Sequence, residues 1–307
     1  MGSGFTPAAC PGMTTEGDSF MANQLPRPGE VFLDHVAHFV PAMEPAAAGL
    51  EQCGFRLTPF TVQTNREGGA TVLSGTGNRC AMLRNGYVEL LVATSDSPLS
   101  RQLDERIADH VGLHLAAFGT ADAATEHSRL AAAGFSTLPL VDMRRPVTVG
   151  DATDDARFTI ARIAHGSMAE GRTQFLTHHT ESLVWRADYL DHPNGAEALD
   201  ALWLAAEDPA EPAARYSRFT GRPARQEGGI TVVSLDRGAV NIATPEHLGT
   251  LGIAPAGALP GFVATTIRVG SLARLRDRLD MPYREAAGAV VVALPGAVGD
   301  TMIFREG

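Results

Sequence analysis

The sequence contains little cysteine and no long hydrophobic run. Its three cysteines, Cys10, Cys53 and Cys80, are an odd number, and none has the Cys-x-x-Cys spacing of a zinc or redox site. Such usage fits a reducing compartment, so we expect a cytoplasmic protein. Since no apolar run approaches the roughly 18 residues that a bilayer-spanning helix needs, we expect no membrane partner.

The chain also lacks an excess of positive charge. Its formal net charge is -10, and no basic stripe offsets the acidic residues. This balance argues against a nucleic-acid partner and favours a small-molecule substrate. The first 30 residues are rich in Gly, Pro, Ser and Thr but lack the basic start and apolar core of a signal peptide. We therefore expect residues 1–30 to form a disordered tail.

Familiar catalytic and nucleotide-binding motifs are missing as well. The sequence has no GxGxxG or Walker pattern, and no G-x-S-x-G or catalytic-cysteine context. The chemistry of the protein has to be sought in other residues.

Directly behind the tail lies a strand-like stretch, VFLDHVAHFV, at residues 31–40. Its alternation puts His35 on one face of a strand and His38 on the other. An Ala-rich helical run follows and ends at Gly54, a typical helix C-terminal cap. Three more strand segments then end with YVELLVAT, so the order is one strand, one helix and three strands.

This βαβββ order occurs four times along the chain. The second copy begins with VGLHLAAFG, and the fourth with GFVATTIRVG. The third aligns directly with the first, LDALWLAAEDPAEPAARY from Leu199 against LDHVAHFVPAMEPAAAGL from Leu33. Such a repeat determines the fold.

A single module covers one sheet face with its helix and leaves the other face bare, so two modules are expected to pair into a cup. The predicted fold class is α+β, with four βαβββ modules paired into two cup-shaped domains. The first domain spans residues 31–180 and the second residues 199–307, with a linker at residues 181–198 that turns at Pro-Asn-Gly.

This organisation resembles the vicinal oxygen chelate superfamily, and within it the glyoxalase-like domain proteins. The superfamily also includes extradiol dioxygenases and the fosfomycin and bleomycin resistance proteins. The resemblance covers the chain from about residue 31 to the C-terminus. It rests on five motifs: LDHV at Leu33, GTGNR at Gly75, GYVELL at Gly86, RRPV at Arg144, and HHT…VW…HPNGA from His178 to Ala196.

The resemblance implies a divalent metal on the cup face, with one ligand from the first and one from the last strand of each module. Applied here, the first strands supply His35 and His114. Alignment of GYVELL with GRTQFL gives Glu89 and Gln174 on the last strands. Imidazole and carboxylate ligands suit Zn, Ni, Fe or Mn, and an amide oxygen is an acceptable weak fourth ligand.

The second domain serves as an internal control for this site. In module three, the positions aligned with His35 and Glu89 are Ala201 and Asn241. In module four, the first-strand position is Ala264 or Thr265, and the last-strand position is Met302. Packing needs alone do not explain this contrast, so we expect the site in the N-terminal domain.

Three further residues are candidates for substrate chemistry. His178 shares the cup face with Gln174 and could act as a general acid or base, or simply contact the linker. Arg79 and Arg145 could anchor an anionic substrate group through the guanidinium fork, and surface ion pairs are the alternative.

The resulting functional expectation is a metal-dependent enzyme that binds vicinal oxygens of a small substrate. Glyoxalase-type lyase or isomerase chemistry, with Glu89, Gln174 and His178 as catalytic residues, is favoured over two alternatives. One is an extradiol-type dioxygenase with a facial triad of His35, His114 and Glu89. The other is a non-catalytic binding protein of the bleomycin resistance kind. A homodimer is possible, because superfamily members pair modules within or between chains.

Overall fold

The computed structural model describes residues 24–149 and 152–307. Most of the predicted disordered tail, residues 1–23, lies outside the described residues. The rest of that segment, residues 24–30, contains no helix or strand, but its Gln24 is buried and donates a hydrogen bond of 2.8 Å to the backbone carbonyl of Arg84.

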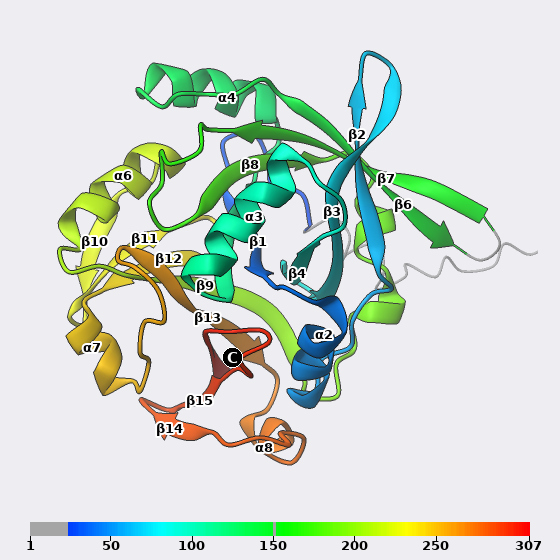
Figure 1. The fold of residues 1–307 in the computed structure, drawn as a ribbon. Helices are drawn as coiled ribbons and strands as arrows, with labels where there is room; N and C mark the ends of the chain where they lie inside the picture. Colours follow the sequence, from blue (N-terminus) through cyan, green and yellow to red (C-terminus); the bar gives the residue numbers. More distant parts are fainter. Residues whose placement is uncertain (1–23, 150–151) are drawn as a thin grey trace, which may run out of the picture.

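The predicted order of four βαβββ modules is confirmed (Figure 1). The first module consists of β1 (Phe32–Phe39), α2 (Met43–Gln52), β2 (Thr61–Glu67), β3 (Ala70–Met82) and β4 (Tyr87–Ala93). The second consists of β5 (Gly112–Gly119), α4 (Ala123–Ala132), β6 (Val141–Val149), β7 (Ala152–Arg162) and β8 (Arg172–His178).

The second half repeats the pattern with shorter strands. The third module consists of β9 (Ala196–Ala205), α6 (Ala210–Thr220), β10 (Ala224–Glu227), β11 (Ile230–Ser234) and β12 (Ala239–Ala243). The fourth consists of β13 (Gly261–Val269), α8 (Leu272–Arg276), β14 (Arg284–Ala286), β15 (Ala289–Ala293) and β16 (Thr301–Glu306). The connections contain α3 (Pro98–Asp109), α5 (Glu181–Val184), η1 (Ala187–Tyr189) and α7 (Pro245–Thr250).

A glycine with a left-handed backbone conformation follows three of the four module helices. Gly54, Gly134 and Gly221 follow α2, α4 and α6 with φ values of 79°, 86° and 68°. A side chain at these positions would be strained, whereas glycine adopts this conformation readily.

The N-terminal strands form a closed barrel rather than an open cup. Their order is β1-β4-β3-β2-β6-β7-β8-β5, and the barrel closes where β2 pairs with β6 through Thr64 opposite Arg144 and Asn65 opposite Met143. The C-terminal strands form an open eight-stranded sheet, β10-β11-β12-β9-β13-β16-β15-β14. An eight-stranded barrel has room inside for packed side chains and at most one small ligand.

Side chains from short helices and loops cover both ends of the barrel. At one end α3 inserts Leu103, which is fully buried in the interior cluster beside Phe39 and Leu91. At the other end, Trp185 directly follows α5 and Leu190 directly follows η1, and both side chains belong to the same cluster. The interior is thereby reduced to a small space in the middle of the barrel.

The two halves pack through the outer faces of β1 and β5 against β9 and β13. Val36 and Phe118 from the barrel share one hydrophobic cluster with Leu202 and Phe262 from the second sheet. No helix in the described part of the chain is long and apolar enough to cross a bilayer.

A buried ion pair also joins the halves. Arg215 of α6 donates from Nη1 to Glu170 Oε2 at 2.8 Å, with the Glu170 side chain 0% exposed and that of Arg215 9% exposed. We predict that Glu170→Ala lowers the free energy of unfolding by about 3 kcal/mol, because it leaves the buried guanidinium with a thioether acceptor, Met168 Sδ, and the exposed carboxylate of Glu211. Urea unfolding of the full chain measures the loss.

The control is the exposed pair of Arg101 with Asp96, whose side chains are 58% and 79% exposed. Asp96→Ala is expected to change the free energy of unfolding by less than about 1 kcal/mol. Equal losses in the two variants would contradict a special contribution of the buried pair.

Candidate active site in the N-terminal barrel

The geometry of the site begins with two bulges where β1 pairs with β5. His35, Val36 and Ala37 lie opposite Ala117, Ala116 and Leu115, and the register shifts by one residue on either side of this stretch. The extra residues are Asp34 on β1 and His114 on β5. A bulge inserts one residue and turns the side chains beyond it to the other face.

This register corrects one expected equivalence. Around the pair of Val36 and Ala116, the counterpart of His35 is Leu115, and His114 is the counterpart of Asp34. Sequence alignment matches His35 with His114 instead of Leu115. A bulge on each strand leaves the two sequences equal in length, so the alignment shows no gap. The neighbouring strands keep the expected equivalence, since Glu89 lies beside Ala37 and Gln174 beside Ala117.

The same reasoning locates the matching positions in the second sheet. Bulge residues Asp200 and Val263 precede Ala201 and Ala264, which therefore correspond to His35. Asn241 lies beside Trp203, and Ile303, rather than Met302, lies beside Thr266. The four positions are thus Ala, Asn, Ala and Ile, and only the barrel combines imidazole and carboxylate.

A small inner cavity of about 40 Å³ occupies the middle of the barrel. His35, Glu89 and Gln174 all line it. His35 stacks on Tyr87 with ring centroids 4.3 Å apart, and its Nε2 lies 3.8 Å from Glu89 Oε2. The structure therefore brings three of the four predicted ligands to one cavity, from the neighbouring strands β1 and β4 and from β8, which is separated from β1 by β5.

His35 is held in one orientation by Asp34. The Nδ1 of His35 donates to Asp34 Oδ1 at 2.7 Å, and His178 Nε2 donates to Asp34 Oδ2 at 2.9 Å. Since a carboxylate only accepts, His35 carries a proton on Nδ1, and Nε2 is the ring nitrogen that faces Glu89. Carboxylate contacts of this kind fix the tautomer of histidines that bind metals or act as bases.

The charge of Asp34 is stabilised by the same contacts. Burial raises the pKa of this carboxyl, but the charge and hydrogen bond of His178, together with those of His35, outweigh burial and hold the pKa well below its usual range. Asp34 is therefore ionised wherever the protein is folded near neutral pH.

Glu89 is held on one side and left open on the other. Its Oε1 accepts hydrogen bonds from Asn78 Nδ2 at 2.5 Å and Gln63 Nε2 at 3.2 Å, while Oε2 faces His35. Gln174 Oε1 is buried and has no hydrogen-bond partner among the described residues. These three groups present a nitrogen lone pair, a carboxylate oxygen and an amide oxygen to the inner cavity.

The remaining predicted residues lie elsewhere. His114 does not line the cavity: its Nε2 contacts the backbone carbonyl of His110 at 2.8 Å, and its ring packs on Phe39. Burial lowers the pKa of His114 to about 4. Within the described residues no cluster of three or more His, Cys, Asp or Glu side chains could hold a metal ion.

His178 lies behind the site rather than in it. It does not line the inner cavity, is buried between Phe158 and Trp185, and is hydrogen-bonded to Asp34, which in turn orients His35. Arg79 faces outward, where its Nε donates to the backbone carbonyl of Thr58 at 2.9 Å and its Nη2 lies 3.3 Å from Glu51. That direction corrects the expectation that Arg79 anchors a substrate, because its strand position points away from the interior.

Arg145 does face the inner cavity and is 8% exposed. Its Nη1 lies 3.7 Å from Cys80 Sγ, a weak acceptor. The guanidinium therefore stays free to contact a bound molecule.

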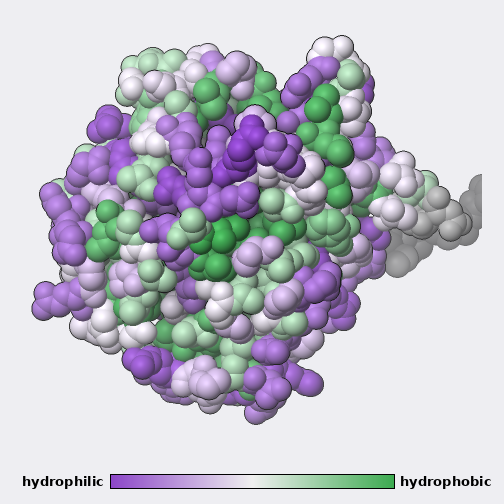
Figure 2. Space-filling view, in the orientation of Figure 1, coloured by the Kyte–Doolittle hydropathy of each residue, from purple (hydrophilic) through white to green (hydrophobic). Residues whose placement is uncertain are grey.

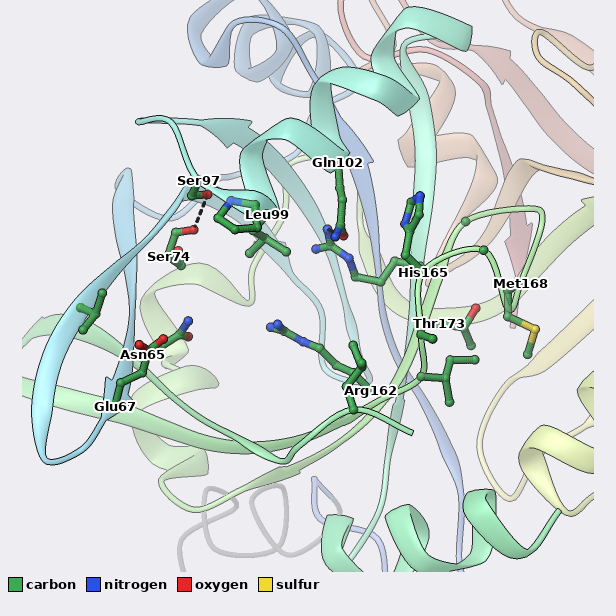
Figure 3. Close-up of a pocket in the computed structure, with 18 of the residues that line it drawn as sticks. Asn65, Glu67, Ser74, Ser97, Leu99, Gln102, Arg162, His165, Met168 and Thr173 are labelled. Atoms are coloured by element: carbon green, nitrogen blue, oxygen red, sulfur yellow. Dashed lines mark hydrogen bonds between the residues drawn. The ribbon is translucent and has the colours of Figure 1, made fainter. Parts of the chain in front are cut away.

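Helix α3 and two more arginines at its end of the barrel are not predicted from the sequence. Arg162 and Arg172 line the inner cavity and also a larger outer cavity of about 490 Å³ at the α3 end of the barrel (Figure 3). A usable signal for α3 was present, since Ser97 and Ser100 form a capping box around Pro98 at the helix start. The two arginines end β7 and begin β8, where repeat alignment gives no signal.

Comparisons with known proteins agree with this architecture. A family model described as a glyoxalase-like domain matches residues 33–220. No curated protein sequence matches the chain.

Among solved structures, a hypothetical protein from Staphylococcus aureus matches with a TM-score of 0.61 and 12% identity, over 90% of this chain and 100% of that chain. A mutant 4-hydroxymandelate synthase from Streptomyces coelicolor matches with a TM-score of 0.51 and 14% identity, over 91% and 93%. The Mn(II)-bound glyoxalase from Novosphingobium aromaticivorans matches with a TM-score of 0.51 and 10% identity, over 91% and 82%. At these identities the likeness shows a shared fold.

We predict that Asp34→Asn destabilises the protein by about 1–3 kcal/mol at neutral pH, because an amide cannot accept from both histidines as a carboxylate does. The lowered pKa means that the carboxylate contribution is complete above the ordinary value of 3.8 and is lost as the pH falls below it. Urea unfolding of both proteins across this pH range measures the difference.

Asp155→Asn serves as the control, because the Asp155 side chain is 45% exposed. Its effect on the free energy of unfolding should be small at every pH. A difference between Asp34→Asn and the parent protein that stays constant as the pH falls would contradict the role assigned to the Asp34 charge.

Proposed function

Because the chain belongs to the glyoxalase-like domain family, which its residues 33–220 match, we propose that it is a metal-dependent enzyme acting on a small organic substrate. The substrate binds inside the N-terminal barrel through two neighbouring oxygens. The observation that carries this proposal is the convergence of His35 Nε2, Glu89 Oε2 and Gln174 Oε1 on one buried cavity, with the second sheet providing no such set.

The donor set fits a divalent ion. His35 is oriented through its other nitrogen by Asp34, and Glu89 through its other oxygen by Asn78 and Gln63. The buried, unpartnered Gln174 Oε1 is the orphaned acceptor that a cation would satisfy. A bound divalent ion would polarise the substrate oxygens and stabilise the negative charge that develops on them.

Within this arrangement the chain itself supplies the proton chemistry. Glu89 is the one carboxylate among the described residues that line the inner cavity. Its Oε2 is placed to take a proton from the substrate carbon beside the oxygens and to return it to a neighbouring carbon. Leu91, Phe158 and Leu176 surround this carboxylate and keep bulk water away. Lyase or isomerase chemistry of the glyoxalase type uses these steps.

His114 separates this proposal from oxygenase chemistry. The facial triad of His35, His114 and Glu89 does not converge, because the β5 bulge directs His114 to the backbone of His110. With Leu115 at the position that corresponds to His35, the inner cavity offers one histidine and one carboxylate among the described residues.

A second candidate function follows from the same leucine. Leu115 removes a ligand that a tightly held catalytic ion would use, and this favours a small-molecule binding protein that employs the barrel without turnover. Metal content distinguishes the two candidates.

We predict that protein purified without chelator carries about one divalent ion per chain, and that His35→Ala and Glu89→Gln each lower metal affinity by about 10-fold or more. Equilibrium dialysis against Mn²⁺ and Zn²⁺, followed by elemental analysis, measures both quantities.

His114→Ala is the matched control, since it removes a buried histidine from the adjacent strand without removing a cavity donor. It should keep parental metal affinity. Metal loss in His114→Ala equal to that in His35→Ala would refute the assigned ligand set, and an absence of metal affinity in the parent protein would favour the binding function.

A further inference from the structure

The barrel interior carries more positive than negative charge. Three arginines, Arg145, Arg162 and Arg172, line the inner cavity, against Glu89 as the one carboxylate among the described lining residues. The described contacts of these guanidiniums are with neutral atoms, Cys80 Sγ for Arg145 and Gln102 Oε1 for Arg172, the latter at 3.3 Å. Uncompensated charge in a desolvated interior is costly unless a partner neutralises it.

Two of these arginines sit at the boundary between the inner and outer cavities. Both Arg162, at the end of β7, and Arg172, at the start of β8, line each cavity. In Figure 3 the Arg162 side chain reaches into the middle of the outer cavity, below Gln102 of α3. Its Nε is buried and has no hydrogen-bond partner among the described residues. The pair thus stands between the α3 end of the barrel and the Glu89 site.

Arg162 and Arg172 are like charges that line the same interior. Arg162 has a buried Nε, and the Arg172 guanidinium lies over the ring of Phe39, 5.4 Å from its centroid. A bound anion would offset the desolvation of both groups and the repulsion between them.

The outer cavity adds an apolar surface beyond the arginines. Leu73 and Leu138 line it and are 62% and 41% exposed, and Leu99, Ile163 and Met168 complete its apolar wall. Hydrophobic colour lies along the projecting hairpin between β2 and β3, which carries Leu73, in Figure 2. Exposed apolar surface at the rim of a cavity is typical of a ligand-binding surface.

We propose that Arg162 and Arg172 form a clamp for an oxyanion, and that the substrate is an organic acid whose anionic group lies between them. The substrate oxygens then face His35 and Glu89 in the inner cavity, and an apolar portion extends over Leu73 and Leu138 toward solvent. This assignment rests on the proposed function, because it takes the barrel as the substrate site. Guanidinium forks bind carboxylate and phosphate with two parallel hydrogen bonds.

Calorimetric titration of the full chain with acetate, hexanoate and inorganic phosphate tests the clamp. Hexanoate is expected to bind at least about tenfold more tightly than acetate, because its methylenes cover the apolar wall. Arg162→Gln and Arg172→Gln should each weaken binding by about tenfold or more. The ratio of phosphate to acetate affinity identifies which oxyanion the clamp prefers.

Arg144→Gln is the matched control, because Arg144 lies outside both cavities and pairs with Asp142 and Asp155. It should leave every affinity unchanged. Arg162→Lys and Arg172→Lys keep the charge and should recover part of the binding, which a purely structural role would not produce. Thermal unfolding of each variant verifies that it folds.

The clamp is refuted if the parent protein binds none of the three anions, or if the folded Gln variants bind them as the parent does. Metal affinity, measured on the same samples, is expected to stay unchanged in both Gln variants. Loss of metal affinity in His35→Ala with anion binding retained would support the clamp on its own. Anion binding without any metal affinity in the parent would contradict the metal-dependent function and not the clamp.

Discussion

The antiparallel pairing of β1 with β5 is the constraint on which the site depends. Its two bulges decide which side chains of the central strands face the barrel interior. Because of the first bulge, Asp34 lies at the edge of the interior and His35 follows it into the cavity. The second bulge places His114 of β5 against Phe39 and the backbone of His110, so that it is buried but does not line the cavity. The strands that flank this pair then add Glu89 on one side and Gln174 on the other.

The sequence predicted the module order and the helix ends at glycine, because periodicity and turn chemistry are local properties. Of the four ligands that the family resemblance implied, His35, Glu89 and Gln174 line one cavity. His114 shows the limit of this reasoning. Two bulges at symmetric positions keep the strand lengths equal, so the motifs His-Val-Ala-His-Phe and His-Leu-Ala-Ala-Phe align in the wrong register without any gap. Bulge placement depends on the partner strand, which a linear pattern does not contain.

The cavity-lining positions of Arg162 and Arg172 could not be predicted from the sequence for a different reason. Arg162 and Arg172 line an enclosed cavity only because β2 pairs with β6 and α3 covers the end of the barrel. These long-range contacts turn an open cup into a closed interior. The same long-range closure makes Arg145 a lining residue, whereas Arg79, equally plausible in sequence, lies on the outer side of β3. Inward or outward direction follows from alternation, but enclosure follows from topology.

The second sheet is built from the same module as the barrel but carries different side chains at the site positions. The same βαβββ module folds there with Ala201, Asn241, Ala264 and Ile303 at the positions that correspond to the donors of the barrel. The architecture therefore does not need polar donors at these positions in order to form. In the barrel, buried imidazole, carboxylate and guanidinium groups cost stability that an apolar lining would not. The chain thus contains its own comparison: at equivalent positions one half carries mainly apolar side chains, and the other buries polar and charged groups that lower its stability.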